Sequence, residues 1–215
     1  MARAYSPTEI KKMKKDVLDF EGAWFEAFRK PERVGVWFIW GKSGNGKSSF
    51  VMQLCKELTK YGKVIYDSLE EGVSLTLKES LERHKMEEIK RGRFAILDCE
   101  PMDKLSERLS KHKSADFIVI DSFQYTQMNY SQYLSFRKEH RNKLLIFISH
   151  ADGSKPSGRS AVNVQFDAGL KIWVEGFRAI SKGRYIGDRG YFTIWDKGAV
   201  KYWGEEFKND KQENI

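Results

Sequence analysis

The residues best suited to chemistry in this 215-residue chain lie between positions 41 and 49. Residues 41–48 read Gly-Lys-Ser-Gly-Asn-Gly-Lys-Ser and fit the pattern G-x-x-x-x-G-K-[ST] in full. Glycines at this spacing allow a tight loop whose backbone N–H groups point at a bound anion. In such a loop Lys47 neutralises the β- and γ-phosphates of a nucleotide, and the hydroxyl of Ser48 binds Mg²⁺. We therefore predict a nucleotide-binding loop made of Gly41, Lys42, Ser43, Gly44, Asn45, Gly46, Lys47, Ser48 and Ser49.

A second requirement is a carboxylate beside the phosphates, because Mg²⁺ and the attacking water both need acidic partners. Three predicted strands end in aspartate, at Asp67, Asp98 and Asp121. Residues 117–120 are apolar up to Asp121, and this pattern is typical of a Walker B strand. We expect Asp121 to orient Mg²⁺, directly or through water, and Asp67 and Asp98 to be turn residues.

The elements that position these residues follow from short apolar runs that alternate with helical patterns. The expected buried strands cover 34–40, 64–66, 94–97, 117–120 and 144–148. The expected helices between them cover 47–60, 74–90, 103–113 and 131–142. Strands that alternate with helices need crossover connections, which predicts an α/β fold with a mostly parallel sheet covered on both faces.

Both ends of the chain depart from this alternation. Ser6, Pro7 and Glu9 have the spacing of a capping box, and apolar residues at intervals of three and four continue to Phe28. This predicts a basic amphipathic helix within residues 1–33. After position 170 the pattern changes to short strands with glycine-containing turns, at 171–174, 177–181, 191–195 and 200–203. We expect an ATPase-type core over 34–204 that ends in β-hairpins, followed by a polar tail over 205–215.

Residues 67–72, Asp-Ser-Leu-Glu-Glu-Gly, follow the second predicted strand. They resemble the strand-end glutamate pair of RecA-like P-loop ATPases, in particular the branch that contains DnaB, KaiC and RadA. The resemblance implies that Glu70 positions or deprotonates the attacking water, with Glu71 as its neighbour. The alternative is that both acids complement the dipole of a following helix. The phosphate loop favours the catalytic interpretation.

Two further segments resemble this family, so that the likeness covers roughly residues 34–203. The strand at 144–148 leads to Ser149 and His150, where family members usually carry a glutamine that senses the γ-phosphate. His150 departs from that pattern, and it either donates to phosphate or simply ends the strand. Lys182-Gly-Arg184 resembles the K-x-R element that KaiC- and DnaB-like subunits insert into a neighbouring ATP site. The resemblance thus implies a homo-oligomer, a ring or filament with shared sites, in which Lys182 and Arg184 stabilise transition-state charge.

ATP is the expected nucleotide, because the guanine-reading N/T-K-x-D motif is absent, although GTP stays open. In RecA-like motors the loops after the Walker B and sensor strands grip nucleic acid. Residues 124–130 and 151–160 correspond to them here, and the second stretch has the glycine, serine and proline content of a mobile loop. They offer Tyr125 and Tyr130 for stacking on single-stranded DNA and Lys155 and Arg159 for phosphate contacts. Core packing of the tyrosines, or nucleotide contact by the two cations across a subunit interface, are the alternatives.

Composition limits the remaining possibilities. The chain is 40% hydrophobic and 13% aromatic, which excludes a disordered protein, and its net charge of +8 suits an acidic partner. Two cysteines and four histidines show no metal-binding spacing. The first residues lack the apolar core of a signal peptide, and the most apolar run, 34–40, is far shorter than the roughly 20 residues that cross a bilayer. We expect a cytoplasmic protein without a membrane segment.

The sequence as a whole favours a Mg²⁺-dependent ATPase that is oligomeric and acts on DNA in replication, recombination or repair. Three alternatives stay open: a KaiC-like regulatory ATPase that controls a protein partner, a P-loop small-molecule kinase, and a nucleotide-binding module without turnover. No arginine-rich lid segment supports the kinase, and the terminal hairpins fit a RecA-like core better.

Overall fold

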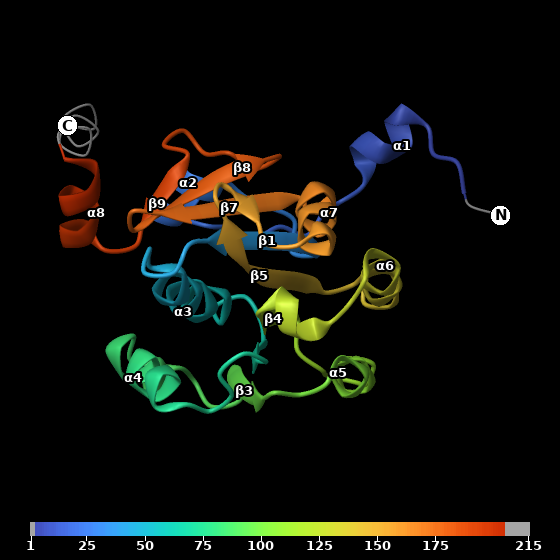
Figure 1. Ribbon diagram of the computed structural model, residues 1–215. Coiled ribbons are helices and arrows are strands. Elements are labelled where there is room, and N and C mark those ends of the chain that lie inside the picture. Colours follow the sequence, from blue (N-terminus) through green and yellow to red (C-terminus); the bar gives the residue numbers. More distant parts are fainter. Residues whose placement is uncertain (1–2, 205–215) are drawn as a thin grey trace.

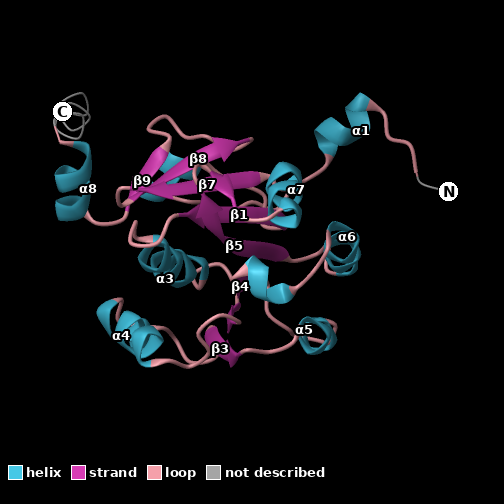
Figure 2. Ribbon diagram, viewed as in Figure 1, coloured by secondary structure: helices cyan, strands magenta, loops and turns pink. Residues whose placement is uncertain are grey.

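A twisted, mostly parallel β-sheet forms the centre of the computed structural model, which describes residues 3–204 (Figures 1 and 2). Its strands follow the order β3-β2-β4-β5-β1-β7-β8-β9, and β6 pairs with the end of β5. Pairing is parallel from β3 through β7 and antiparallel between β7, β8 and β9. The strands are β1 (Gly35–Gly41), β2 (Val64–Ser68), β3 (Phe94–Asp98), β4 (Phe117–Asp121), β5 (Leu144–Asp152), β6 (Lys155–Pro156), β7 (Leu170–Glu175), β8 (Arg178–Gly183) and β9 (Tyr191–Thr193).

Helices cover both faces of this sheet because its strands bury side chains on both sides. In β1, Trp37 and Ile39 belong to one hydrophobic cluster, whereas Phe38 and Trp40 belong to the other. The first cluster takes apolar residues from α2 (Gly22–Phe28), α3 (Lys47–Leu58) and α4 (Leu75–Arg83). The second takes them from α5 (Met102–Leu109), α6 (Tyr130–Glu139) and α7 (Arg159–Asp167). The expected α/β fold with a doubly covered sheet is confirmed.

The predicted single helix near the N-terminus is wrong. Ser6 and Glu9 do form the capping box, but α1 (Pro7–Lys12) ends after six residues and buries none of them. An extended segment follows, in which Val17 pairs with Glu32, and α2 begins only at Gly22. Pairing with the chain near position 32 supplies backbone hydrogen bonds and buries Leu18 and Phe20, whereas a helix there would have nothing to pack against. In Figure 1, α1 lies apart from the layered body.

The last predicted strand, 200–203, is also wrong, because α8 (Asp196–Trp203) occupies this region. Asp196-Lys-Gly198, expected as a hairpin turn, forms the first turn of that helix. Gly198 lets the helix approach closely, since a Cβ there would lie 2.4 Å from Trp195 and 2.6 Å from Phe177. Trp203 then donates its indole N–H to the carbonyl of Gly176 at 3.0 Å.

Two other boundaries differ from expectation. The helix predicted over 74–90 breaks after Arg83, because Lys85 adopts a left-handed conformation before the short 3₁₀ turn η1 (Met86–Glu88). The stretch 151–160, expected as a mobile loop, contains β6 and the first residues of α7. The predicted polar tail, 205–215, lies outside the described residues. Among residues 3–204, no helix has the length and apolar character needed to span a bilayer.

Candidate nucleotide site

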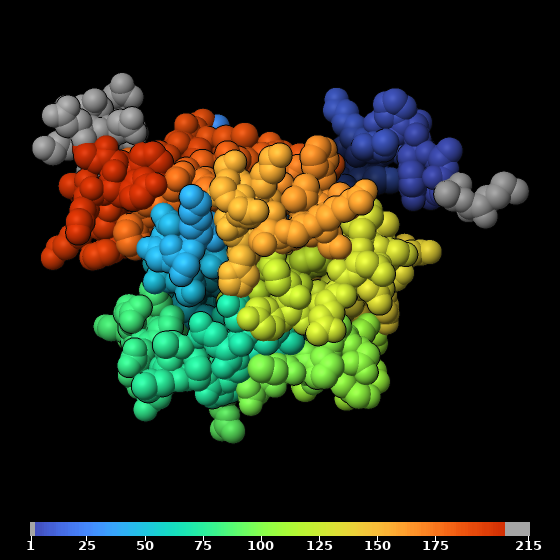
Figure 3. Space-filling view, in the orientation of Figure 1, coloured from blue at the N-terminus to red at the C-terminus, as the bar shows by residue number. Residues whose placement is uncertain are grey.

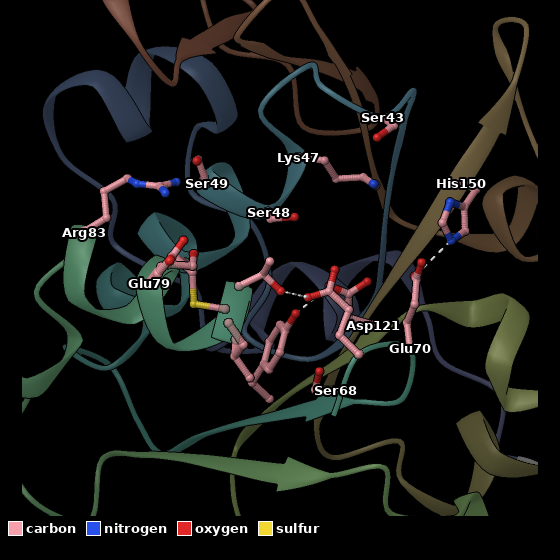
Figure 4. Close-up of a pocket in the computed structure, with 16 residues that line it drawn as sticks. Ser43, Lys47, Ser48, Ser49, Ser68, Glu70, Glu79, Arg83, Asp121 and His150 are labelled. Atoms are coloured by element: carbon pink, nitrogen blue, oxygen red, sulfur yellow. Dashed lines mark hydrogen bonds and ion pairs between the residues drawn. The ribbon is translucent and has the colours of Figure 1, made fainter. Parts of the chain in front are cut away.

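One edge of the sheet collects the residues that the sequence singles out, because parallel strands end together. Gly41 at the end of β1 lies opposite His150 on β5, and Ser68 at the end of β2 lies opposite Asp121 on β4. The cavity at this edge has a volume of about 370 Å³. It is lined by residues from the phosphate loop, from the ends of β2, β4 and β5, and from α4 (Figure 4).

The phosphate loop has the backbone conformation that its glycines predict. Gly44 and Gly46 have φ values of 77° and 91°, which a residue with a side chain rarely adopts. Gly41 is required for a different reason, since a Cβ there would lie 2.4 Å from the carbonyl oxygen of Val174. Asn45 fixes the loop to the turn after β7 by accepting the N–H of Gly176 through its Oδ1 at 2.8 Å.

The loop residues divide into those that face the cavity and those that shape the loop. Ser43, Lys47, Ser48 and Ser49 line the cavity, and Lys47 and Ser48 point into it in Figure 4. Gly41, Gly44, Asn45 and Gly46 contribute backbone, whereas the exposed Lys42 lies outside the cavity and lines a shallow hollow on the other side. A helix N-terminus with inward N–H groups and one lysine is an anion site by its own geometry.

Asp121 ends β4 inside the cavity, and the hydroxyl of Tyr66 donates a hydrogen bond to its carboxylate. Burial raises the pKa of Asp121, while the Tyr66 hydrogen bond and the positive charge of Lys47 oppose that rise. A divalent cation beside this carboxylate would remove the cost of its buried charge. Ser48 and Asp121 supply the oxygen ligands that Mg²⁺ prefers, and the residues present therefore fit this ion.

Among the described residues, no group of three or more His, Cys, Asp and Glu side chains is arranged to hold a metal by itself. Mg²⁺ is commonly bound by one or two protein oxygens together with substrate phosphates and water. A site formed only when the nucleotide binds agrees with this arrangement.

Glu70 and His150 are brought into direct contact, although 80 positions separate them in the chain. The His150 Nε2 atom lies 2.9 Å from Oε2 of Glu70, as the dashed line in Figure 4 shows. The backbone N–H of Glu70 also donates to the carbonyl of Asp121 at 3.1 Å, which ties the Glu70 segment to the end of β4. The carboxylate of Glu70 therefore lies between the acidic strand end and His150.

Glu71 has a different environment from that of Glu70. Its Oε2 accepts hydrogen bonds from the hydroxyls of Thr76 at 2.7 Å and Ser74 at 3.2 Å. Ser74 in turn caps α4 by accepting the N–H of Leu77. These contacts direct Glu71 to the start of the helix and leave Glu70 as the glutamate next to His150.

Asp67 and Asp98 hold the loops that follow β2 and β3. Asp98 accepts the N–H of Val73 at 3.0 Å, and Asp67 accepts the N–H of Glu100 at 3.1 Å. Asp67 is fully buried, and its Oδ2 atom has no hydrogen-bond partner within the described part of the chain. Burial raises the pKa of Asp67 to about 6.

Lys182 and Arg184 do not line the cavity of their own chain. β8 runs antiparallel to β7, so that Lys182 pairs with Lys171 and Gly183 with Leu170, which begins β7 at the far end of the sheet. Both side chains are exposed. Any role for them at a phosphate therefore needs a site on another copy of the chain.

The residues expected to bind DNA are only partly brought together. Gln124 donates its amide to the carbonyl of Ser157 and to the Ser149 hydroxyl, both at 2.8 Å, and thereby joins the segment after β4 to the one after β5. Tyr125 is exposed in the 3₁₀ turn η2 (Phe123–Thr126), and Lys155 and Arg159 are exposed on the joined segment. Figure 3 shows the two segments, yellow-green and light orange, beside the light-blue phosphate loop.

Tyr130 belongs to a different environment from Tyr125. It is partly buried and stacks on Tyr133, with ring centroids 5.7 Å apart. This packing favours the core interpretation that the sequence left open for it.

Sequence reasoning missed several residues of the cavity. Tyr66 lies in a buried strand and reads there as core, although its hydroxyl is directed at Asp121. Glu79 and Arg83 line the cavity from α4, but their spacing of four is that of any exposed helix pair. Only the packing of α4 against α3 reveals that these side chains reach the site.

Comparisons with known proteins bear on the fold. No protein-family model and no curated protein matches the chain. Among solved structures, it resembles a KaiC-like protein from the hyperthermophilic archaeon Pyrococcus horikoshii, with 20% identity, a TM-score of 0.52, and coverage of 75% of this chain and 89% of the other. It also resembles the flagellar accessory protein FlaH from Methanocaldococcus jannaschii, with 14% identity, a TM-score of 0.55, and coverage of 83% and 92%.

The ATPase domain of a DnaB-like protein matches with 15% identity and a TM-score of 0.51, over 71% of this chain and 78% of that domain. These likenesses show the fold, and the chain has the RecA-like P-loop architecture that its motifs predict.

The buried Asp67 generates a prediction about stability and pH. Its pKa is raised from 3.8 to about 6, so that the folded protein binds the proton more tightly than the unfolded chain does. Stability then falls as pH rises from about 4 to about 6. Asp67→Asn keeps the acceptor for Glu100 and removes the charge, so we expect it to exceed wild type in free energy of unfolding by up to about 3 kcal/mol at pH 7.

Urea unfolding between about pH 4 and pH 7 measures this difference. It should shrink to near zero at the acidic end, where both forms of the protein are neutral at this position. Asp98→Asn, in an exposed loop, is the matched control and should show no such gain. An Asp67→Asn advantage that is independent of pH would contradict the assignment.

Proposed function

We propose that the protein binds ATP with Mg²⁺ and hydrolyses it in an assembly of several copies that acts on single-stranded DNA. The observation that carries the enzymatic part is the convergence of Lys47, Ser48, Asp121, Glu70 and His150 on one cavity. Four separate segments supply these residues, and the RecA-like fold brings them together. The combination provides charge neutralisation, metal ligands and a base in one place.

Each of these residues has a role set by its place in the cavity. Lys47 and the loop N–H groups bind the β- and γ-phosphates, and Mg²⁺, held by Ser48 and Asp121, neutralises the charge that develops on them. Glu70 accepts the proton of the attacking water. His150, in contact with Glu70, donates to the γ-phosphate oxygen and reports its presence to the strand end.

Lys182 and Arg184 support an assembly with shared sites. Both are exposed, both lie away from the cavity of their own chain, and together they carry two positive charges close in sequence. Inserted beside the γ-phosphate of a neighbouring copy, they would stabilise the transition state.

Single-stranded DNA is the partner that the joined segments after β4 and β5 fit best. They expose an aromatic ring at Tyr125 together with the charges of Lys155 and Arg159. Stacking surfaces next to cations are the usual means of holding single strands. Gln124 and His150 lie between this surface and Glu70, which gives nucleotide hydrolysis a direct structural route to the DNA segment.

The first prediction concerns the base. Glu70→Gln removes the proton acceptor without changing shape, and we expect kcat for ATP to fall by about 100-fold or more while nucleotide binding persists. Lys47→Ala should instead abolish binding as well as turnover. Released phosphate and ADP, measured together, report the rate.

The matched control is Glu71→Gln, which should lose far less activity because Glu71 is engaged with Ser74 and Thr76. Wild-type turnover in Glu70→Gln would remove Glu70 from the mechanism. ADP formed without an equal amount of free phosphate would point to transfer to an acceptor molecule, as in a kinase.

A second prediction tests the shared site. Lys47→Ala subunits lack a working loop but keep Arg184, whereas Arg184→Ala subunits keep the loop. If Arg184 acts on the neighbouring copy, a mixture of the two inactive proteins regains turnover at mixed interfaces. Each variant alone, at the same total concentration, is the control, and a mixture that stays inactive would refute the shared arrangement.

A third prediction concerns DNA. We expect single-stranded DNA to stimulate ATP turnover by wild type, and the charge reversal Lys155→Glu with Arg159→Glu to remove the stimulation. Tyr125→Ala should weaken DNA binding by about 1–3 kcal/mol, the usual contribution of one stacked base. Turnover titrated with DNA, on protein of verified oligomer mass, gives both answers.

Turnover that is unchanged at every DNA concentration would refute the DNA part while leaving the ATPase intact. Recovery of a specific protein partner only in the presence of ATP would then assign the chain a regulatory role.

A further inference from the structure

The edge of the sheet opposite the nucleotide cavity is formed by the segments that enter the parallel strands. The strand starts are in register, since Phe94 pairs with Val64, Val64 with Phe117, and Phe117 with Leu144. The residues just before these starts therefore form a row across neighbouring strands. The row reads Arg93, Lys63, Asp116 and Lys143. With strands about 4.8 Å apart, it spans roughly 15 Å.

Positive charge dominates the four segments that carry this row, 60–63, 90–93, 111–116 and 141–143. They hold nine lysines and arginines against one carboxylate, that of Asp116. This surplus equals the formal net charge of the whole chain, +8. The nine cations are Lys60, Lys63, Lys90, Arg91, Arg93, Lys111, Lys113, Arg141 and Lys143.

Most of this charge is uncompensated. Among residues 3–204, only Lys60 of the nine has a carboxylate within 4.0 Å, that of Glu57 at 2.6 Å. Asp116 is already engaged, because it accepts the N–H of Lys63 at 2.9 Å and lies 3.6 Å from Arg33. Like charges gathered without counter-charges repel one another, and a polyanion would relieve that repulsion.

The surface is hollowed on both sides of the segment 111–114. One hollow, of about 430 Å³, is lined by Lys111, His112, Lys113 and Lys143, with Glu139 as its acidic residue. The other, of about 270 Å³, shares that segment and adds Lys63 and Arg108. The segment is a ridge with a cationic depression on either side.

Lys143 fixes this ridge from beneath. Its side chain is buried, and Nζ donates to the Ser114 hydroxyl at 2.8 Å and to the carbonyl of Ala115 at 2.7 Å. Nζ of Lys63 donates to the carbonyl of Lys113 at 3.1 Å from the other side. The ridge is therefore held in place before any ligand arrives, which lowers the entropic cost of binding.

The chemistry of this edge indicates which polyanion it fits. None of the large exposed hydrophobic side chains of the described residues lies in the four segments. Protein interfaces usually contain such apolar or aromatic anchors, and single strands are usually held by stacking. Cations alone are the means by which proteins bind the phosphate backbone of a duplex without reading its bases.

We propose that the amino-terminal edge of the sheet, formed by segments 60–63, 90–93, 111–116 and 141–143, binds the phosphate backbone of double-stranded nucleic acid. Phosphates of one strand repeat every 3.4 Å or so along a duplex, and an edge of roughly 15 Å thus faces about four of them. The surface is separate from the cavity and from the Tyr125 segment, and its binding does not require ATP.

The test is fluorescence anisotropy with a labelled DNA duplex of mixed sequence, without nucleotide, between about 50 and 200 mM NaCl. Lys111→Glu with Lys113→Glu reverses two exposed charges on the ridge, and we expect Kd to rise tenfold or more at about 50 mM salt. The slope of log K against log salt should become less negative by about 2. ATP turnover by this variant, measured in parallel, should equal that of wild type.

The matched control is Lys197→Glu with Lys201→Glu, which changes net charge equally on exposed positions of α8. This variant should bind the duplex within about twofold of wild type, apart from the general effect of charge. If the ridge variant shows a lowered melting temperature, Lys90→Glu with Arg91→Glu, in another exposed segment of the same edge, replaces it.

Equal losses in the ridge and control variants would overturn the proposal, because net charge alone would then explain binding. Failure of wild type to bind the duplex at about 50 mM salt would also overturn it, and retention on polyglutamate instead would indicate an acidic protein partner. A loss of duplex binding by Lys155→Glu with Arg159→Glu, and not by the ridge variant, would place the duplex at the other edge. These outcomes do not depend on whether the protein hydrolyses ATP.

Discussion

The in-register parallel pairing of β4, β5 and β1 is the constraint on which the nucleotide site depends. β5 lies between the strand that carries Asp121 and the strand that leads into the phosphate loop. His150, at its end, therefore reaches the space between metal ligand and loop, and it meets Glu70 there. A shift of one residue in β5 would turn His150 to the opposite face of the sheet and break this contact.

The cavity combines groups that are costly to bury with groups that limit the cost. Burial raises the pKa of Asp121, and Lys47 together with the hydroxyl of Tyr66 opposes that rise. Asp67, one strand end away, has no comparable positive neighbour, and its pKa is raised to about 6. The two aspartates end neighbouring strands, but only Asp121 faces the cavity, and this difference in surroundings separates a metal ligand from a loop-holding residue.

The same parallel sheet gives its two edges opposite chemistry. At the carboxyl ends of the strands, carboxylates, hydroxyls and loop N–H groups surround a cavity. At the amino ends, entering segments present cations with one carboxylate among them. Since parallel strands all begin on one side and end on the other, charges that are scattered along the sequence are sorted into two surfaces about a strand length apart.

The sequence by itself determined the phosphate loop, the strands that lead to Asp121 and His150, and the α/β class, because these depend on local spacing and on runs of buried residues. Tertiary structure alone decided the contact of Glu70 with His150 and the donation from Tyr66 to Asp121, which join residues far apart in the chain. It also decided both ends of the chain. Backbone pairing near Glu32 replaced a helix that local periodicity favours, and packing on Phe177 turned 196–203 into a helix, since local patterns carry no information about which surface is available for burial.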